Sequence, residues 1–516
     1  MKLIRHTHDL SFTHTTSFSP GQLVPVAHLE ILPGDTINMK TSALLRCEPL
    51  NKPLMHEVEM RIHHWFVPNR ILWDGWEDFI TGVTAPTTTA TRPPVTQTSD
   101  PANMEIIDHC GGRPLQNTAY TAFLNRGYNT IWNEFYRDQE LQNALTTSQL
   151  DTSGKLANIN WNKDYFTTAR SSPQEGAATT IPLNLDTLPV KGLGISGSNN
   201  TRSNITDFQE SGTYEARDAS GSLSATNDLF YETVSQTAPA VSPYYPNIRV
   251  DTADLGLGIT IDTLRQAMAT QRVLEARSLF GTRYTDYLAY YGVKSSDARL
   301  QRPEYLGGFT KRIHFSEVLN TGASTGDLFG HGIAHKSGGR FRKMFEEHGH
   351  LFSLMSVRPL ATYQQGRPRK FNRQTPFDYW TREFENTPWQ EIKLSELFSV
   401  ATNSDDPHRS GTTFTGDPTF GYTSRFDEYR ESPNIVSGAL RRTDTTVVDA
   451  DKSNYTWGRY FKDSLIPSTV DGVFTECKPT TEIFQSALTD PFIVHLNHSI
   501  KAKRLVSTNA RIMHAL

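Results

Sequence analysis

The sequence predicts a mainly β protein, an elaborated antiparallel sandwich or barrel with long loop and helix-containing insertions. Short segments in which apolar and polar residues alternate recur along the 516-residue chain, as is typical of half-buried strands. Long stretches rich in Thr, Ser, Asn and Pro separate these segments. Only two or three segments have helical spacing, whereas a doubly wound α/β sheet needs regular alternation of strands and helices.

The earliest candidate strands precede Pro68. Apolar residues are concentrated at positions 23–32, and a Pro-Gly-Asp turn signal follows them. Residues 37–45 can form a second strand. Residues 55–67 alternate apolar with polar side chains, which indicates a third strand with one buried face.

Three segments have the spacing of a helix. Between residues 121 and 141, large apolar side chains recur three and four positions apart. Residues 263–280 form the second candidate, with Asp262 in place to cap its start and Gly281 to end it. A short helix is expected at 282–291.

Further strands are expected at 338–357, around a polar turn, and at 492–513, where apolar and polar residues alternate again. Residues between 145 and 260 are mostly Thr, Ser, Asn, Asp and Gly, which favours a large surface insertion. No internal repeat is visible. The expected organisation is an N-terminal arm at 1–18, a first strand-rich part at 19–144, a variable surface insertion at 145–260, and a second strand-rich part with helices, loops and a basic C-terminal strand at 261–516.

Composition limits the classes of function. The net charge of −4 argues against a protein whose whole surface grips nucleic acid, although one basic face remains compatible with it. The three cysteines are far apart and show neither a disulfide framework nor zinc spacing. The N-terminus lacks a signal peptide and no window resembles a membrane span, so we expect folding in a reducing cytosol.

The search for reacting centres predicts no enzyme, no cofactor and no metal site. The segment 330–337 resembles a phosphate-binding loop, but His335 stands where a glycine is required, so a polar loop is expected there. His63 and His64 are adjacent on a strand and point to opposite faces. His348 and His350 could share a face, but no third metal ligand can be named.

Two basic clusters are candidates for contact with single-stranded DNA, because cations beside an aromatic ring attract phosphates and stack on bases. An equally simple interpretation is that they form salt bridges between subunits or a solvated face. The first cluster interleaves with Phe371, and the second lies near the C-terminus. The candidates are Arg367, Arg369, Lys370 and Arg373 in the first cluster, and Lys501, Lys503, Arg504 and Arg511 in the second.

Several segments resemble the major capsid proteins of the microvirus family, in particular its gokushovirus-like branch. They occur in the family's order and cover about half of the chain. The most specific match is residues 297–308, DARLQRPEYLGG. The other matches are 17–25, 60–82 with FVPNRILWDGWEDFITG, 128–138, 290–293 and 421–430.

The resemblance implies a viral jelly roll of eight antiparallel strands in two packed sheets. It implies a T=1 icosahedral shell, sixty copies by family resemblance, made in the host bacterial cytoplasm and enclosing circular single-stranded DNA in the virion. Implied partners are other copies of the chain, the packaged DNA, a small basic DNA-binding protein, a minor or pilot protein and a host cell-surface receptor, without membrane insertion. In this branch a large insertion forms threefold protrusions, and residues 145–260 are assigned to it for host attachment.

Two other classes remain open on the residues alone. A β-sandwich carbohydrate-binding protein or glycoside hydrolase would account for tryptophans beside polar residues, and as an enzyme would need two carboxylates about 5–10 Å apart. A phage attachment or spike protein would normally show repeats or a coiled-coil stalk, and the sequence has neither.

Overall fold

The computed structural model divides the chain into a large unit, Met1–Ala177 with Val273–Leu516, and a small unit, Ala178–Arg272. The fold described below is that of the large unit; of the small unit, only residues 261–272 are described. The described residues are 4–50, 54–81, 95–96, 100–147, 154–174, 176, 261–281, 283–294, 296–297, 299, 301–319, 328–386, 389–398, 417–441, 456–461, 467–484 and 490–507.

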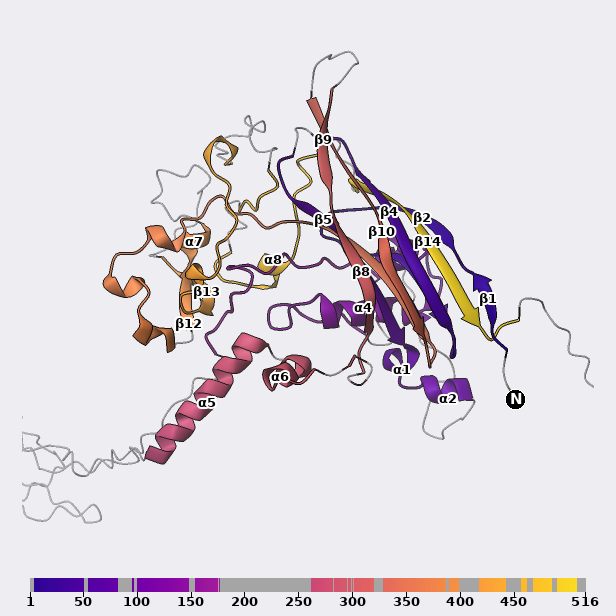
Figure 1. The fold of residues 1–516 in the computed structure, drawn as a ribbon, viewed down its shortest axis with the longest axis horizontal. Helices are drawn as coiled ribbons and strands as arrows, with labels where there is room; N and C mark the ends of the chain where they lie inside the picture. Colours follow the sequence, from indigo (N-terminus) through magenta and orange to yellow (C-terminus); the bar gives the residue numbers. More distant parts are fainter. Residues whose placement is uncertain are drawn as a thin grey trace, which may run out of the picture. The chain divides into compact units, whose positions relative to one another are not determined.

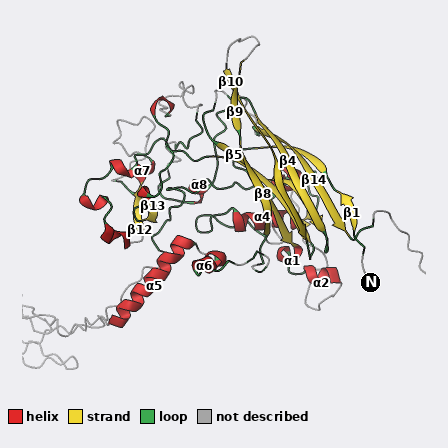
Figure 2. Ribbon diagram, viewed as in Figure 1, coloured by secondary structure: helices red, strands yellow, loops and turns green. Residues whose placement is uncertain are grey.

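The large unit is built on two antiparallel sheets (Figures 1 and 2). The six-stranded sheet has the order β1-β14-β4-β10-β9, and β2 also pairs with β14; the four-stranded sheet has the order β3-β11-β5-β8. Two small sheets pair β12 with β13 and β6 with β7. The strands are β1 (His6–Asp9), β2 (Phe12–Phe18), β3 (Val24–Ile31), β4 (Thr36–Cys47), β5 (Val58–Pro68), β6 (Val95–Thr96), β7 (Tyr120–Thr121), β8 (Glu304–Arg312), β9 (His314–Leu319), β10 (Leu328–Met344), β11 (Gly349–Pro359), β12 (Trp389–Lys393), β13 (Thr419–Ser424) and β14 (Phe492–Arg504).

Helices are short apart from two. They are α1 (Asn69–Leu72), α2 (Trp76–Thr81), α3 (Glu105–His109), α4 (Phe123–Phe135), α5 (Ile261–Phe280), α6 (Tyr284–Tyr290), α7 (Leu394–Leu397) and α8 (Gly472–Thr475). The expected helix at 121–141 is shorter, because the chain turns after Tyr136 to bring Asp138 to Lys163 and Arg170. Helix α5 begins at Ile261, so Asp262 lies inside its first turn and does not precede it.

The main core lies between the two sheets. Along β14, residues alternate between buried and exposed, because successive side chains of a strand point to opposite faces. Ile500 of β14 and Met39 of β4 are opposite one another and fully buried. In the four-stranded sheet, Met355 of β11 and Ile62 of β5 are likewise opposite one another and fully buried. Each such side chain stabilises the fold by about 1.5–3 kcal/mol.

The other face of the four-stranded sheet is also covered, which explains why β11 is buried almost throughout. Phe352 of β11 packs against α4, where a side-chain carbon at Gly127 would come within 2.6 Å of the Phe352 ring. Tyr128 of α4 is fully buried, and its hydroxyl donates to the carbonyl of Leu23 at 2.7 Å. The large unit therefore has three layers: sheet, sheet, and a layer of α4 with irregular chain.

The expected fold class is confirmed: a mainly β antiparallel sandwich with long insertions. Apart from β1 and β2, the six-stranded sheet has four strands, as does the other sheet, so the two sheets contribute eight strands besides those of the N-terminal segment. The predicted N-terminal arm is extended, but its described residues 4–18 are not free, because β1 and β2 are hydrogen-bonded to β14.

Two expectations are wrong in their details. The polar loop expected at 330–337 is part of strand β10, which pairs with β4 and β9 on its two sides. Within the proposed insertion at 145–260, residues 154–174 pack in the third layer, where Trp161 and Phe166 are buried. This part of the core was missed because its aromatic side chains stand among polar neighbours in the sequence and show no regular spacing. Residues 177–260 lie outside the described residues, so their role stays a prediction.

Candidate nucleic-acid interface

Strand β14 places two of the predicted DNA-contacting cations on the outer face of the six-stranded sheet. Lys501 and Lys503 are exposed and alternate with the buried Ile500 and Ala502. Period-2 alternation thus separates the charged side chains from the core without any loop or cap. Solvated ammonium groups in this position are available to a polyanion.

Arg504, the third cation of the C-terminal cluster, is engaged within the chain. Its guanidinium Nε lies 2.8 Å from Oδ2 of Asp35, a carboxylate whose side chain is 1% exposed. Its Nη2 also donates to the carbonyl of Glu30 at 2.7 Å. Arg504 therefore ties β14 to the turn before β4. Arg511, the fourth candidate, lies outside the described residues.

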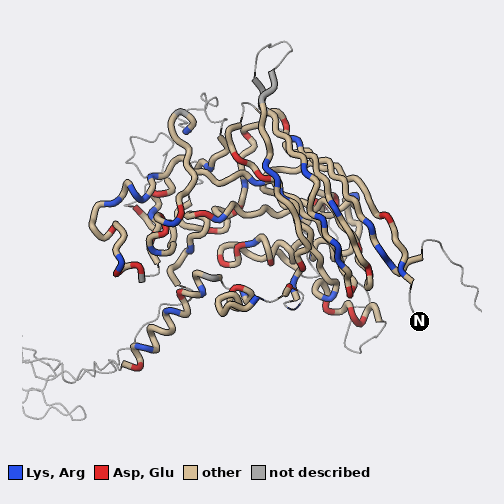
Figure 3. The backbone as a smooth tube through the Cα atoms, in the orientation of Figure 1, with Lys and Arg blue, Asp and Glu red and all other residues tan. Residues whose placement is uncertain are grey.

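Strand pairing brings further cations to this face. Arg342 of β10 and Lys501 of β14 both lie opposite Asn38 of β4, one on each side. Arg340 is exposed at the β-bulge of β10, and its Nε donates to Oδ1 of Asn38 at 3.3 Å. Figure 3 shows Lys and Arg positions spread over β4, β10 and β14.

We call this surface the cationic face. Its outward side chains belong to β1, β2, β4, β10 and β14, and among those that the structure describes Asp9 is the acidic one. Asp9 lies opposite Lys501. Hydrogen bonds from Ser11 lower the pKa of the Asp9 carboxyl, and Lys501 adds to the effect. The cations of the face are Lys40, Arg46, Arg340, Arg342, Lys501 and Lys503.

Four of these six cations were missed from the sequence. Lys40 and Arg46 each stand alone among uncharged neighbours on β4, whereas Arg340 and Arg342 belong to a short basic run at 340–343 of β10 that was not singled out. A search for clusters along the chain does not detect cations that gather only when strands pair. The available signal was the alternation of β4, which puts Lys40 and Arg46 on its exposed side.

The first basic cluster, residues 367–373, lies in the third layer, on the opposite side of the sandwich from β14 (Figure 1). Arg369 Nη1 lies 3.3 Å from Oε1 of Glu396, and Arg373 Nη2 lies 3.3 Å from Oε1 of Glu428. Burial raises the pKa of the Glu396 carboxyl despite the neighbouring guanidinium. These two arginines are thus engaged by carboxylates.

The rest of this first cluster is solvent-accessible. Arg367 and Lys370 are exposed, and the Lys370 ammonium lies 5.1 Å from the centre of the Phe371 ring, which is 67% exposed. Arg373, by contrast, stacks on Tyr429 with 4.6 Å between the guanidinium carbon and the ring centre. The structure therefore does not bring the two sequence clusters together, and it divides the first one.

Three of the described histidines, His64, His350 and His498, are buried. His63 and His64 point to opposite faces as predicted: His63 bonds to the Tyr136 hydroxyl at 2.8 Å, and His64 bonds to Ser353 at 2.7 Å. His348 and His350 do not form a pair, because only His350 lies in β11, where it contacts His28 at 2.9 Å. Burial lowers the pKa of His350 to about 3.

No group of three or more His, Cys, Asp or Glu side chains that could hold a metal ion is found within the described part of the chain. Among the same residues, no helix has both the length and the apolar character needed to cross a membrane.

Comparison with known proteins agrees with the resemblance. A family model described as capsid protein (F protein) matches residues 1–512. The capsid protein VP1 of Chlamydia phage 1 is 30% identical over 514 residues, covering 86% of each chain. That of Bdellovibrio phage phiMH2K is 32% identical over 457 residues, covering 85% of this chain and 82% of the relative. That of Spiroplasma virus 4 is 26% identical over 464 residues, covering 84% and 82%.

A match over nearly the whole length places the chain among structural proteins and not among enzymes. The alternative of a carbohydrate-binding protein or glycoside hydrolase receives no support from it. The chain belongs to the capsid protein (F protein) family of small, microvirus-like phages.

Proposed function

We propose that this major capsid protein assembles into a closed T=1 shell of sixty copies whose inner wall is the cationic face, turned toward circular single-stranded DNA. The observation that carries the proposal is the segregation of six Lys and Arg with one Asp on one sheet face, in a chain of net charge −4. Sequence-independent DNA binding is driven mainly by cations that neutralise phosphates and release counterions. A flat row of lysines and arginines across three paired strands fits that task.

The proposed contacts revise the initial set of residues. Lys501 and Lys503 remain DNA contacts, and Lys40, Arg46, Arg340 and Arg342 join them. Arg504 is assigned a structural role instead, because its guanidinium pairs with Asp35. Arg511 remains a candidate from the sequence.

The first basic cluster is a second, smaller candidate. Arg367 and Lys370 are exposed beside Phe371, an arrangement suited to phosphate attraction and base stacking. Arg369 and Arg373 then support this segment through their carboxylate partners and do not bind DNA themselves.

Binding of the purified protein to a fluorescent oligothymidylate tests the proposal for the cationic face. A triple variant, K40Q/R342Q/K501Q, should weaken binding and reduce the slope of log affinity against log salt by about 2, because each single-strand phosphate contact contributes about 0.7. The matched control replaces three exposed cations elsewhere, Arg312, Arg430 and Lys478. Equal salt slopes in the triple variant and the wild type would refute the assignment.

Residues 177–260 are proposed as the threefold protrusion that contacts the host receptor. Their composition, rich in Thr, Ser and Asn, suits an outward-facing surface. A phage carrying a short linker in place of residues 180–258 should form particles that package DNA and attach poorly to cells. Absence of particles would contradict the proposal, because an insertion outside the sandwich is not needed for the shell.

Assembly is proposed to take place in the host bacterial cytoplasm with a small basic DNA-binding protein and a minor or pilot protein as partners. Negative-stain microscopy of the protein from expressing cells, alone and with those partners, tests this. Closed shells of one small diameter are expected. A protein that stays monomeric in both cases would exclude the shell.

A further inference from the structure

A cavity of about 530 Å³ lies on the face of the four-stranded sheet that the third layer covers. Arg61 and His63 of β5 and Ser356 and Arg358 of β11 form its floor. Its walls come from residues 135–140 and 159–163 and from Arg170, Gly281, Arg283 and Asp286, all within the large unit. The volume lies within the range of about 300–1,000 Å³ typical of small-molecule sites.

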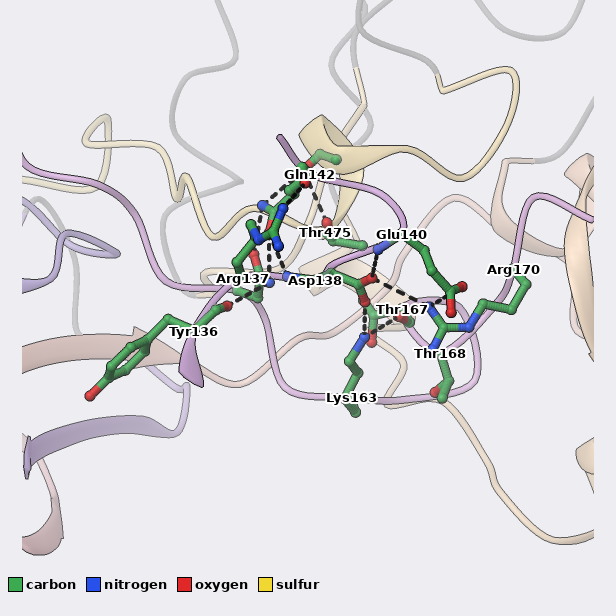
Figure 4. A network of polar contacts seen from close by, with 12 residues as sticks. Tyr136, Arg137, Asp138, Glu140, Gln142, Lys163, Thr167, Thr168, Arg170 and Thr475 are labelled. Atoms are coloured by element: carbon green, nitrogen blue, oxygen red, sulfur yellow. Dashed lines mark hydrogen bonds and ion pairs between the residues drawn. The ribbon is translucent and has the colours of Figure 1, made fainter. Parts of the chain in front are cut away.

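The charge of the lining is unbalanced, with six Lys and Arg against three Asp and Glu. Two of the three carboxylates are already neutralised in the network of Figure 4. Asp138 Oδ2 lies 2.6 Å from Lys163 Nζ, and Glu140 Oε2 lies 2.9 Å from Arg170 Nη1. Of the other charged side chains, Arg61 pairs with Glu59 outside the lining, which leaves Arg137, Arg283 and Arg358 with Asp286 as the one remaining carboxylate.

Three arginines of the lining, Arg137, Arg283 and Arg358, donate to main-chain carbonyls. Arg358 Nη1 lies 3.1 Å from the carbonyl oxygen of Asn160, and Arg283 Nη2 lies 2.7 Å from that of Arg137. Arg137 Nη1 donates to the carbonyl of Gln142 at 3.1 Å. Among the described residues, no carboxylate lies within ion-pair distance of these three guanidinium groups.

Hydrogen bonds to carbonyls satisfy donors but leave the charge unneutralised. The Nε atoms of Arg137 and Arg358 are buried, and within the described chain they have no acceptor. Burial, with the nearby Arg61, lowers the pKa of Arg358 to about 10. Taking a guanidinium out of water without a counter-charge is unfavourable, so a site of this kind favours the binding of an anion.

We propose that this cavity binds a phosphate group, held by Arg358, Arg283 and Arg137. Three guanidinium groups with the one carboxylate of Asp286 give a net charge of +2, which suits a dianion better than a single carboxylate, and the planar donor fork of arginine matches phosphate oxygens. The site is distinct from the cationic face, because it lies on the far side of the four-stranded sheet. The proposal therefore does not depend on DNA binding by the six-stranded sheet.

Isothermal titration calorimetry of the purified full-length protein with inorganic phosphate tests the proposal. Saturable one-site binding is expected, and R358Q should weaken it at least about tenfold, or about 1.4 kcal/mol. R137Q serves as the second variant if R358Q does not fold. The matched control is R312Q, whose exposed side chain pairs with Glu57 outside the cavity and should leave the affinity unchanged.

Competition then identifies the source of the phosphate. If oligothymidylate displaces bound phosphate, the source is a nucleic-acid phosphate. This competition should be lost in R358Q and kept in K40Q/R342Q/K501Q. Displacement by thymidine monophosphate alone points to a free phosphate ester. Failure of inorganic phosphate to bind saturably at millimolar concentration, or binding that neither R358Q nor R137Q weakens, would overturn the proposal.

Discussion

Acid should destabilise the sandwich through His64 of β5 and His498 of β14, whose side chains are fully buried between the sheets. His64 bonds to the Ser353 hydroxyl at 2.7 Å, and His498 Nε2 bonds to the carbonyl oxygen of Val26 at 3.0 Å. Burial lowers the pKa of His64 to about 3, and the neighbouring His498 adds to this. Burial likewise lowers the pKa of His498 to about 4.

The sign of the pH effect follows from these shifts. In the unfolded chain both rings return to their ordinary pKa near 6.5, so below that pH the unfolded state binds protons that the folded state excludes. The stability that the neutral rings provide is complete above pH 6.5 and is lost as the pH falls toward 4. Well below pH 6.5 each ring lowers the unfolding free energy by about 1.4 kcal/mol per pH unit, which is about 4 kcal/mol for both rings between pH 7.5 and pH 5. Because whole domains are stable by only about 5–15 kcal/mol, this loss is large.

Urea unfolding of the unassembled protein, followed by tryptophan fluorescence at pH 7.5, 6 and 5, measures the effect. In H64L the slope of the unfolding free energy against pH, between pH 6 and 5, should decrease by about 1.4 kcal/mol per unit, because unfolding takes up one proton fewer. Losing the bond to Ser353 lowers the stability at every pH without changing the slope. The control is H495Q, an exposed ring on the outer side of β14. A slope in H64L equal to that of the wild type would refute the reasoning.

Three other substitutions or treatments have expected outcomes. F352A empties a fully buried site against α4 and should lower the unfolding free energy by about 3–5 kcal/mol in urea unfolding; a loss below about 1 kcal/mol would contradict the packing. G21A should lower the melting temperature more than G111A, although both glycines have φ near +90°. The new side-chain carbon at Gly21 would lie 2.0 Å from the Cys477 carbonyl oxygen, whereas that at Gly111 would meet nothing within 4 Å. The thiols of Cys47 and Cys477 are buried and their pKa values are raised to about 11 and 12, so a disulfide reagent should label them at pH 8 only in urea.

Patterns with a short period could be predicted well from the sequence. Apolar and polar residues that alternate with a period of two predict the strands β4, β5 and β14, because this alternation determines which side chains are buried. The spacing of three and four in the segment of α4 likewise predicts a helix with one buried face. These properties depend only on neighbours along the chain.

Properties that depend on pairing between distant segments could not be predicted. His28 and His350 are 322 positions apart and form one buried pair. Arg369 lies 27 positions before its partner Glu396, within a segment whose cations were considered as a local cluster. The strand β10 contains four glycines near residues that resemble a phosphate loop, and only its pairing with β4 and β9 makes it extended. Register is set by the opposing strand, and composition does not encode it.

The cationic face shows why the net charge of a chain is a poor guide to what one surface binds. With six cations and one Asp, the face contributes +5 to a total of −4, so the remainder of the chain carries −9. A dipolar distribution of this kind orients each copy toward a polyanion, because phosphates attract one side and repel the other. The separation needs only a strand whose residues alternate between buried and exposed. The same pattern that builds the core therefore also selects the side that we propose meets the DNA. If that is correct, moving a lysine from position 501 to the buried position 500 should damage folding, while moving it to position 499 should preserve binding to oligothymidylate.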